Sequence, residues 1–374
     1  MPDHLFKIHL VCAARPNFVK VAPLYHALRR CAWVNPLIVH TGQHYDPAMS
    51  DAFFQDFQLP QPDFFLGVGS GTHAAQTGEV MVRYETLCIQ DRPDLVVVVG
   101  DVNSTLAAAL AAKKLNLPVA HLEAGLRSGD RSMPEEINRL ATDAISDFLW
   151  TPSVDADENL LREGQSKEKI ACVGNIMIDA LEMLRSRIVA EHQSGKIGLA
   201  PGSYGVITLH RPSNVDDTNR LQMILGIFRE LATDFPLVFP MHPRTRSRLE
   251  SAGLWDDLAL IPNLHLLEAQ NYISFMSMVF DSRLVITDSG GVQEETTYLG
   301  IPCFTLRDNT ERPITILEGT NRLVKLETLT HAVRTELASP EVPKGPPRLW
   351  DGKAAERIVV QIRRLASLKP DSGA

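Results

Sequence analysis

The chain has 374 residues, of which 44% are hydrophobic and 22% are charged, and it carries a formal net charge of −8. This length exceeds what one compact domain usually holds, so two domains are expected. The acidic balance argues against non-specific binding to nucleic acid or to anionic membranes, because both depend on clustered positive charge.

The first predicted element is a strand over residues 5–14, followed by a helix that begins at Pro16. The apolar run in this strand is too short for a signal peptide or a membrane span, so we expect a cytoplasmic protein. Helical stretches then alternate with short runs rich in Val and Ile, which is typical of parallel strands joined by crossover helices. The further strands of this domain are expected at 36–40, 95–99, 119–122, 149–151 and 170–173.

The strand pattern restarts after a polar stretch that covers residues 191–203. We therefore predict two doubly wound α/β domains, residues 1–174 and 175–353, and a last helix at about 354–369 that could pack on either domain. The strands of the second domain are expected at 205–209, 237–240, 264–267, 284–287 and 303–306. The five cysteines have no close pair at metal or redox spacing, so we expect reduced thiols and no metal site.

Two neighbouring predicted strands end in carboxylates. Asp101 follows the strand at 95–99, and Glu123 follows the strand at 119–122. Ligands of open parallel sheets bind beyond the carboxyl ends of the strands, and neighbouring like charges there indicate acid or base chemistry. Each residue also has a structural alternative, because Asp101 could cap the next helix and Glu123 could lie in a surface loop.

The segment SMPEEINRL predicts a helix that begins at Pro134. Glu135 and Arg139 stand four residues apart in it and share one helix face. Considered alone, this pair is more typical of an ordinary surface ion pair than of a functional site.

The segment DSGGVQEE follows an apolar strand and opens a helix. The backbone N–H groups of Ser289, Gly290 and Gly291 are therefore expected to point at a bound anion, and Glu295 could accept hydrogen bonds from ribose hydroxyls. A plain turn containing Gly-Gly is the alternative. The chain contains neither the P-loop nor the GxGxxG sequence, so no standard dinucleotide fingerprint is available.

Two cations follow the first strand of the first predicted domain, and an imidazole follows the first strand of the second. Arg15 and Lys20 stand in ARPNFVK, and His210 stands in TLHRPSN. An Arg fork and a Lys point charge suit a diphosphate, although each residue could equally be a solvated surface side chain. His44 in TGQHYD and His242 in MHPRT are weaker candidates.

Taken in order, these segments resemble those of the non-hydrolysing UDP-N-acetylglucosamine 2-epimerases, and the similarity is collinear across nearly the whole chain. Its most specific pieces are ARPNFVK, TGQHYD, GDVNST, HLEAGLRSGD, PEEINR, VGN, DSGGVQEE and TERP. The resemblance implies a GT-B fold, in which two Rossmann-like domains hold the active site in the cleft between them. It also implies a homodimer that needs no cofactor.

The resemblance further implies roles for individual residues. It implies catalytic roles for Asp101, Glu123, Glu135 and His210. The residues implied to bind the UDP-N-acetyl sugar are Arg15, Lys20, Arg139, Gln270, Phe275, Ser289, Gly290, Gly291, Glu295 and Arg312. An allosteric site for a second UDP-N-acetylglucosamine is implied in the region of Gln43, His44 and His242.

The implied reaction interconverts UDP-N-acetylglucosamine and UDP-N-acetylmannosamine for cell-surface polysaccharide precursors. Departures from the family pattern at Ala13-Ala14, Asn17, Ile314 and HRPSNVDD leave the carboxylates and His210 intact, so they bear on the substrate and on regulation. The alternatives are a 2-epimerase of a modified UDP-2-acetamido sugar, a hydrolysing epimerase that releases UDP, and a GT-B glycosyltransferase. A sugar-nucleotide sensor without turnover is disfavoured, because it would not need the carboxylates.

Overall fold

The computed structural model describes residues 5–13, 15–42, 54–341 and 345–368. The chain divides into two compact units. The first unit takes the chain up to Met183 and again from Arg348, and the second unit is Leu184–Pro347. The chain passes from one to the other within helix α7 (Ile176–Glu191), beyond the boundary predicted at residue 175.

The first unit contains a parallel sheet of seven strands in the order β3-β2-β1-β4-β5-β6-β7. The strands are β1 (Phe6–Cys12), β2 (Val34–His40), β3 (Phe64–Phe65), β4 (Leu95–Val99), β5 (Val119–Leu122), β6 (Phe148–Thr151) and β7 (Ile170–Cys172). All five residues of β4 are buried, as expected for a strand covered by helices on both faces. Each strand expected from the sequence is present, and the two-residue β3 is an addition.

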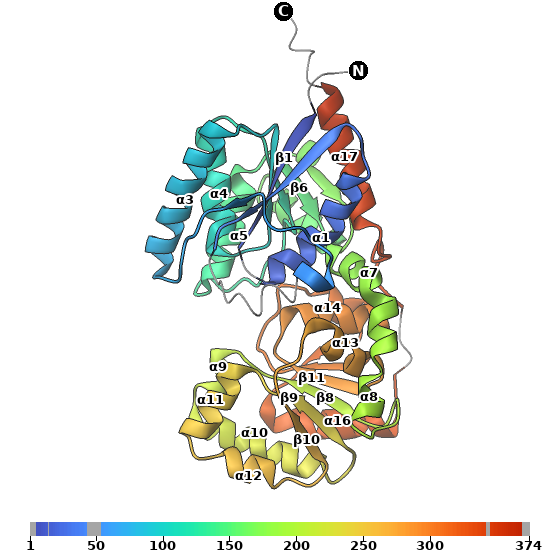
Figure 1. The fold of residues 1–374 in the computed structure, drawn as a ribbon. Coiled ribbons are helices and arrows are strands. Elements are labelled where there is room, and N and C mark those ends of the chain that lie inside the picture. The colour runs from blue at the N-terminus through green and yellow to red at the C-terminus, as the bar shows by residue number, and fades with distance from the viewer. Residues whose placement is uncertain (1–4, 14, 43–53, 342–344, 369–374) are drawn as a thin grey trace, which may run out of the picture. The chain divides into compact units, whose positions relative to one another are not determined.

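Helices cover both faces of this sheet (Figure 1). They are α1 (Arg15–Arg29), α3 (His73–Gln90), α4 (Asn103–Lys114), α5 (Pro134–Ile145), α6 (Val154–Arg162), a short 3-10 helix (Lys167–Lys169), α7 and α17 (Ala354–Leu368). Helices α3, α4 and α5 lie on one face, and α17 packs beside α1 on the other. Asp179 in α7 accepts hydrogen bonds from the backbone N–H groups of Ala354 (3.0 Å) and Ala355 (2.8 Å) and so fixes the start of α17.

The second unit contains a parallel sheet of six strands in the order β10-β9-β8-β11-β12-β13. The strands are β8 (Gly205–Thr208), β9 (Leu237–Pro240), β10 (Leu264–Leu267), β11 (Leu284–Thr287), β12 (Cys303–Thr305) and β13 (Asn321–Leu323). The helices are α8 (Gln193–Lys196), α9 (Pro212–Val215), α10 (Thr218–Leu231), α11 (Pro243–Ser251), α12 (Trp255–Ala259), α13 (Tyr272–Phe280), α14 (Gly290–Leu299), α15 (Ile314–Leu317) and α16 (Leu326–Ala338). The five expected strands are confirmed, and β13 is an addition.

The two sheets share one pattern at their centres. In the first, β1 lies between β2 and β4, and in the second, β8 lies between β9 and β11. The strand order reverses at this point in each sheet, and ligands of doubly wound sheets bind just beyond the carboxyl ends of the strands there. Among the helices that the structure describes, none combines the length and the apolar character that a membrane span requires.

Candidate active site

Asp101 lies just beyond the carboxyl end of β4, where Gly100 turns the chain with a φ of 69°. Its carboxylate is 31% exposed and pairs with the guanidinium of Arg139, which is 2% exposed. The Asn138 amide holds the Asp101 carbonyl oxygen at 2.9 Å. The alternative that Asp101 caps the next helix is wrong, because the cap of α4 is Val102 and no side chain bonds to it there. The structure thus leaves the Asp101 carboxylate oriented but accessible.

Glu123 lies beyond the end of β5, the strand next to β4. Its φ of 71° is in the left-handed region that non-glycine residues rarely adopt, and such strain concentrates at functional sites. The carboxylate is 3% exposed and pairs through Oε2 with Lys20 of α1. Its other oxygen, Oε1, is buried and has no hydrogen-bond partner in the described part of the chain. A surface loop for Glu123 is therefore wrong.

Gly100 brings these groups together. A Cβ atom at Gly100 would lie 3.4 Å from Lys20 Nζ, 3.5 Å from Glu123 Oε2 and 3.6 Å from Asn17 Nδ2. The Asn17 amide in turn donates to the Val99 carbonyl at 2.9 Å. The tips of the neighbouring strands β4 and β5 therefore each carry a carboxylate that is paired with a buried cation.

Helix α5 buries a face made of polar side chains. Its buried residues are Glu136, Asn138, Arg139, Thr142 and Asp143. Glu136 accepts from Arg139 Nε at 3.0 Å and Nη2 at 2.7 Å, and from the backbone N–H groups of Ser128 and Gly129 at 3.0 Å. Burial alone would raise the pKa of Glu136, but these donors outweigh it and hold the pKa below its ordinary value.

The prediction that Glu135 and Arg139 form a surface ion pair is wrong. Arg139 is buried and bridges Asp101 and Glu136 instead. Glu135 is exposed in the first turn of α5, where the helix N-terminus favours a negative charge. Arg139 therefore contacts one of the predicted acid/base carboxylates directly, and Glu135 stands as a separate, solvent-accessible group.

In the second unit, His210 follows β8 and is held by Asp288, which follows the neighbouring strand β11. The His210 Nδ1 atom lies 3.0 Å from Asp288 Oδ1, and the backbone N–H of His210 donates to the same carboxylate at 3.1 Å. Asp288 also accepts from the backbone N–H of Arg211 at 2.9 Å and from Asn214 Nδ2 at 3.0 Å. Burial would raise the pKa of Asp288, but His210 and these donors hold it low.

The glycine-rich segment forms the N-terminus of α14, and Ser289 is its cap residue. The backbone N–H of Ser289 donates to Thr287 Oγ1 at 2.9 Å, so this donor already has a partner within the chain. Gly290 and Gly291 occupy the first turn, as expected for an anion site. A Cβ atom at Gly290 would lie 2.8 Å from Arg312 Nη1, so the glycine also makes room for that guanidinium.

The Arg312 guanidinium is anchored by two acidic residues. Its Nε lies 2.9 Å from Glu294 Oε2, and its Nη1 pairs with Glu311. All three side chains are less than 10% exposed. A cation is thus fixed beside the N-terminus of α14, where a diphosphate would find both a charge and backbone donors.

The remaining predicted nucleotide contacts lie around α13. Glu295 is buried and accepts a hydrogen bond from Tyr272 at 2.8 Å, and burial raises its pKa to about 8. Phe275 is half-buried on α13. Gln270 is half-buried before α13 and donates to the Glu268 carbonyl at 2.8 Å.

Some predicted residues are only partly covered. The backbone of Arg15 begins α1, but its side chain lies outside the described part of the structure, as do Gln43 and His44 entirely. His242 caps α11 by accepting from the Arg244 N–H at 3.2 Å, and its ring centroid lies 5.3 Å from that of His210. In the described ranges, no group of three or more His, Cys, Asp or Glu side chains could hold a metal ion.

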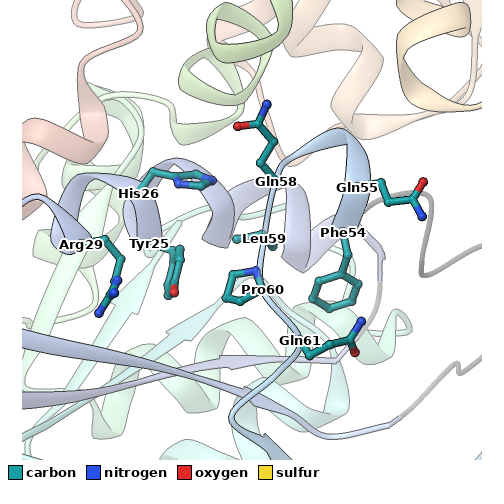
Figure 2. Close-up of a pocket in the computed structure, with 9 residues that line it drawn as sticks. All are labelled: Tyr25, His26, Arg29, Phe54, Gln55, Gln58, Leu59, Pro60 and Gln61. Carbon is teal, nitrogen blue, oxygen red and sulfur yellow. The ribbon is translucent and has the colours of Figure 1, made fainter.

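A hollow of about 610 Å³ opens elsewhere in the first unit (Figure 2). It is lined by Tyr25, His26 and Arg29 from the last turns of α1 and by residues 54, 55 and 58–61. Lys20 lies nearer the start of the same helix, toward the carboxyl ends of the strands. The hollow contains none of the predicted site residues, so we place the candidate site at the strand tips.

Comparisons with known proteins find relatives that match nearly the whole chain. A family model described as UDP-N-acetylglucosamine 2-epimerase matches residues 26–363. The UDP-N-acetylglucosamine 2-epimerase of Methanocaldococcus jannaschii is 42% identical, over 94% of this chain and 98% of that protein. The UDP-2,3-diacetamido-2,3-dideoxy-D-glucuronate 2-epimerase of Pseudomonas aeruginosa is 38% identical, over 96% of this chain and all of that protein.

A solved structure is also similar. The M. jannaschii UDP-GlcNAc 2-epimerase in complex with UDP-GlcNAc and UDP has a TM-score of 0.86 to this chain and is 41% identical to it. The match covers 96% of this chain and 99% of that one. The expected fold of two Rossmann-like units, the GT-B class, is confirmed.

Proposed function

Because the chain belongs to the UDP-N-acetylglucosamine 2-epimerase family, we propose that it inverts C2 of a UDP-linked N-acetylhexosamine and retains UDP during the reaction. It is an isomerase, and a UDP-sugar is its substrate class. The proposed pair is UDP-N-acetylglucosamine and UDP-N-acetylmannosamine.

The chemistry follows from the position of the reacting carbon. C2 of the sugar is not next to a carbonyl, so removal of its proton alone would leave a poorly stabilised carbanion. Loss of UDP from C1 together with the C2 proton gives a neutral 2-acetamidoglucal. A proton then adds to C2 from the opposite face while UDP rejoins C1. The reaction needs an acid, a base and a site that keeps UDP in place.

Each unit supplies one part of this requirement. In the first unit, Asp101, Glu123 and Glu135 are the proposed groups for proton transfer. In the second unit, the first turn of α14 and the anchored Arg312 suit the diphosphate, and His210 is proposed to stabilise the departing UDP.

One observation carries this proposal most directly. Asp101 and Glu123 end adjacent strands, Asp101 remains 31% exposed, and the buried Glu123 holds one oxygen without a partner in the described chain. A carboxylate that is both oriented and accessible is what proton transfer requires. Incubation with UDP-N-acetylglucosamine in D2O, followed by NMR, tests it. Epimer formation with deuterium at C2 is expected, and release of free N-acetylmannosamine and UDP would indicate a hydrolysing enzyme.

A second substrate has support from a specific relative. The 38% identical P. aeruginosa protein is named as a 2-epimerase of UDP-2,3-diacetamido-2,3-dideoxy-D-glucuronate. The same C2 chemistry would serve that sugar, because its 2-acetamido group and UDP leaving group are the same. Adding it to the panel of UDP sugars decides between the two, since the preferred substrate will show the higher kcat/KM.

We further propose a cytoplasmic homodimer that UDP-N-acetylglucosamine activates through the region of Gln43, His44 and His242. The M. jannaschii relative was solved in complex with both UDP-GlcNAc and UDP, and the presence of two different nucleotides supports this proposal. Light scattering of the purified chain measures the oligomeric state. Kinetics of the reverse reaction from UDP-N-acetylmannosamine test the activation, and a lag that added UDP-N-acetylglucosamine removes is expected.

A further inference from the structure

We propose that His121 is a positioning residue, which together with Asp143 fixes the backbone at Gly100 and thereby orients the Asp101 carboxylate. His121 is the third residue of β5 and is fully buried, so it cannot itself contact a substrate. The proposal rests on the proposed function, because it takes Asp101 as one of the groups that transfer a proton.

Both ring nitrogens of His121 have polar partners. Nε2 lies 2.8 Å from the Gly100 carbonyl oxygen, and Nδ1 lies 2.6 Å from Asp143 Oδ1. A carbonyl oxygen can only accept, so Nε2 must carry a proton that it donates to Gly100. Nδ1 faces the Asp143 carboxylate. The hydrogen bonds thus determine which way the ring is turned and which nitrogen faces Gly100.

Asp143 is held in place by two further donors. Its Oδ2 accepts from the Gly125 backbone N–H at 3.0 Å and lies 2.7 Å from Arg127 Nη2. Burial would raise the pKa of Asp143, but His121 and Arg127 outweigh it and hold the pKa below its ordinary value. An ionised, fully bonded carboxylate at 1% exposure is a rigid anchor for the imidazole.

The contacts of this pair fall on the two backbone segments that carry the candidate carboxylates. His121 bonds to Gly100, the residue before Asp101, and Asp143 bonds to Gly125, two residues after Glu123. Gly100, at a φ of 69°, has few steric restraints of its own, so hydrogen bonds hold its peptide groups. Its N–H donates to the Leu122 carbonyl at 3.1 Å, and its carbonyl accepts from His121. A shift of about 1 Å at a reacting group can lower a rate about 100-fold. The pair therefore does more than stabilise the core.

His9 offers a matched control for a purely structural role. It is also a fully buried histidine of the same sheet, in β1. Its Nδ1 lies 3.3 Å from the Tyr84 hydroxyl, and its Nε2 lies 3.2 Å from Asp91 Oδ2. Asp91 precedes β4, so these bonds lie away from the strand tips. A variant of His9 changes one buried and one partly buried hydrogen bond without touching Gly100.

The first test compares three variants, each verified as folded by circular dichroism. A Gln amide nitrogen can reach the position of Nε2, whereas an Asn amide can reach only that of Nδ1. We expect His121→Asn to lower kcat about 10- to 100-fold with KM changed by less than about threefold, and His121→Gln to recover most of that loss. His9→Gln should lower Tm by about as much as His121→Asn does, because both remove hydrogen bonds of a buried histidine. It should leave kcat within about twofold of wild type. Equal kcat losses in the three variants, or no loss in His121→Asn, would overturn the proposal.

The second test needs no folded variant and no epimerase activity. In wild-type protein with ¹⁵N-labelled histidine, NMR should show a His121 ring with a proton bound to Nε2, because the Gly100 carbonyl requires it. A His121 ring without a proton on Nε2 would refute the positioning role even if the enzyme is active. Conversely, absence of epimerisation in wild type would refute the proposed function while this ring signal is still found.

Discussion

The two units place an aspartate at equivalent points and use it differently. Asp101 follows β4, the neighbour of β1, and Asp288 follows β11, the neighbour of β8. Asp101 is 31% exposed, whereas Asp288 is fully buried. The Asp101 side chain pairs with Arg139, whereas Asp288 accepts hydrogen bonds from two backbone N–H groups and from Asn214 and also pairs with His210.

The comparison shows how the hydrogen bonds around a carboxylate decide whether it can transfer a proton. A carboxylate whose lone pairs all accept hydrogen bonds orients its neighbours and is poorly placed to exchange a proton. Asp288 fits this description, because it holds the backbone and ring of His210. The Asp101 carboxylate is oriented by its ion pair with Arg139 and remains accessible to solvent. The same strand-tip position thus yields an orienting group in one unit and a candidate acid or base in the other.

The largest effect is expected from substitutions at the three carboxylates proposed to transfer protons. Asp101→Asn keeps the size of the side chain, and Arg139 remains paired with Glu136 in the variant, so folding should be preserved. Epimerisation and C2 deuteration should fall by roughly 100- to 10,000-fold, because a carboxamide cannot act as a general acid or base at neutral pH. Binding of UDP by calorimetry should change by less than about threefold.

Glu123→Gln and Glu135→Gln extend this test. Each should lose most epimerisation and retain UDP binding, for the same reason. A slow variant could also release UDP and 2-acetamidoglucal if elimination proceeds and reprotonation does not. If all three carboxamide variants, each folded, turn over like wild type, the assignment of proton transfer to these carboxylates is wrong.

Asp288→Asn is expected to have a smaller effect of another kind. An amide NH2 facing the N–H groups of His210 and Arg211 would leave buried donors without an acceptor. The free energy of unfolding should fall by about 1–3 kcal/mol, and UDP binding should weaken about 10-fold because His210 loses its orientation. Urea unfolding and calorimetry measure these two quantities.

Comparing this variant with Asp101→Asn distinguishes an orienting aspartate from one that transfers a proton. We expect the Asp288 variant to lose stability and affinity, and the Asp101 variant to lose only turnover. His210→Ala, which removes the ring and leaves the carboxylate in place, should reproduce the affinity loss with a smaller loss of stability. An Asp288 variant as stable as wild type would mean that its hydrogen bonds do not hold His210.

Much of the fold could be predicted because its signals are local. The run LVVVV in β4 is buried on both faces, and such a run between helical segments is typical of a central parallel strand. Strands β3 and β13 have two and three residues and carry no such pattern. Each of them pairs with a strand that is already part of the sheet, β3 with β2 and β13 with β12. The sequence of the short segment alone does not contain this information.

The site was predicted less completely, and α5 shows why. Its sequence PEEINRLATDAI separates polar from apolar residues, but the structure buries much of the polar face. The sequence alone therefore could not distinguish the exposed Glu135 from the buried Glu136. Asp288 was overlooked for a similar reason, because its contact with His210 spans 78 positions of the chain.

A pH-dependent effect on stability is expected at Glu295. Burial raises its pKa to about 8, against an ordinary value of 4.5. The native state therefore keeps this proton more tightly than the unfolded state, so its contribution to stability is full below pH 4.5 and is lost as the pH rises towards about 8. Relative to wild type, Glu295→Gln should gain stability as the pH rises between these limits, measured by urea unfolding at several pH values.

Glu311 supplies a control of opposite sign. Burial would raise its pKa, but Arg312 and Arg307 outweigh it and hold the pKa low. Glu311→Gln should therefore cost stability at neutral pH, and the loss should shrink as the pH falls below the ordinary pKa of 4.5. A Glu295→Gln variant whose stability relative to wild type does not change with pH would contradict the raised pKa.

The smallest effect is expected from removal of divalent metal ions. Three carboxylates of the site are already paired with a cation or a hydrogen-bond donor, Asp101 with Arg139, Glu123 with Lys20 and Asp288 with His210. A metal ion would have to displace a buried guanidinium or ammonium group, which would leave that charge uncompensated. The proposed elimination needs proton transfer and stabilisation of UDP, and protein side chains can supply both. Dialysis against EDTA should therefore change kcat/KM by less than about twofold. A loss of activity that is restored only by a divalent ion would show that a metal, and not Arg312 with the N-terminus of α14, neutralises the diphosphate.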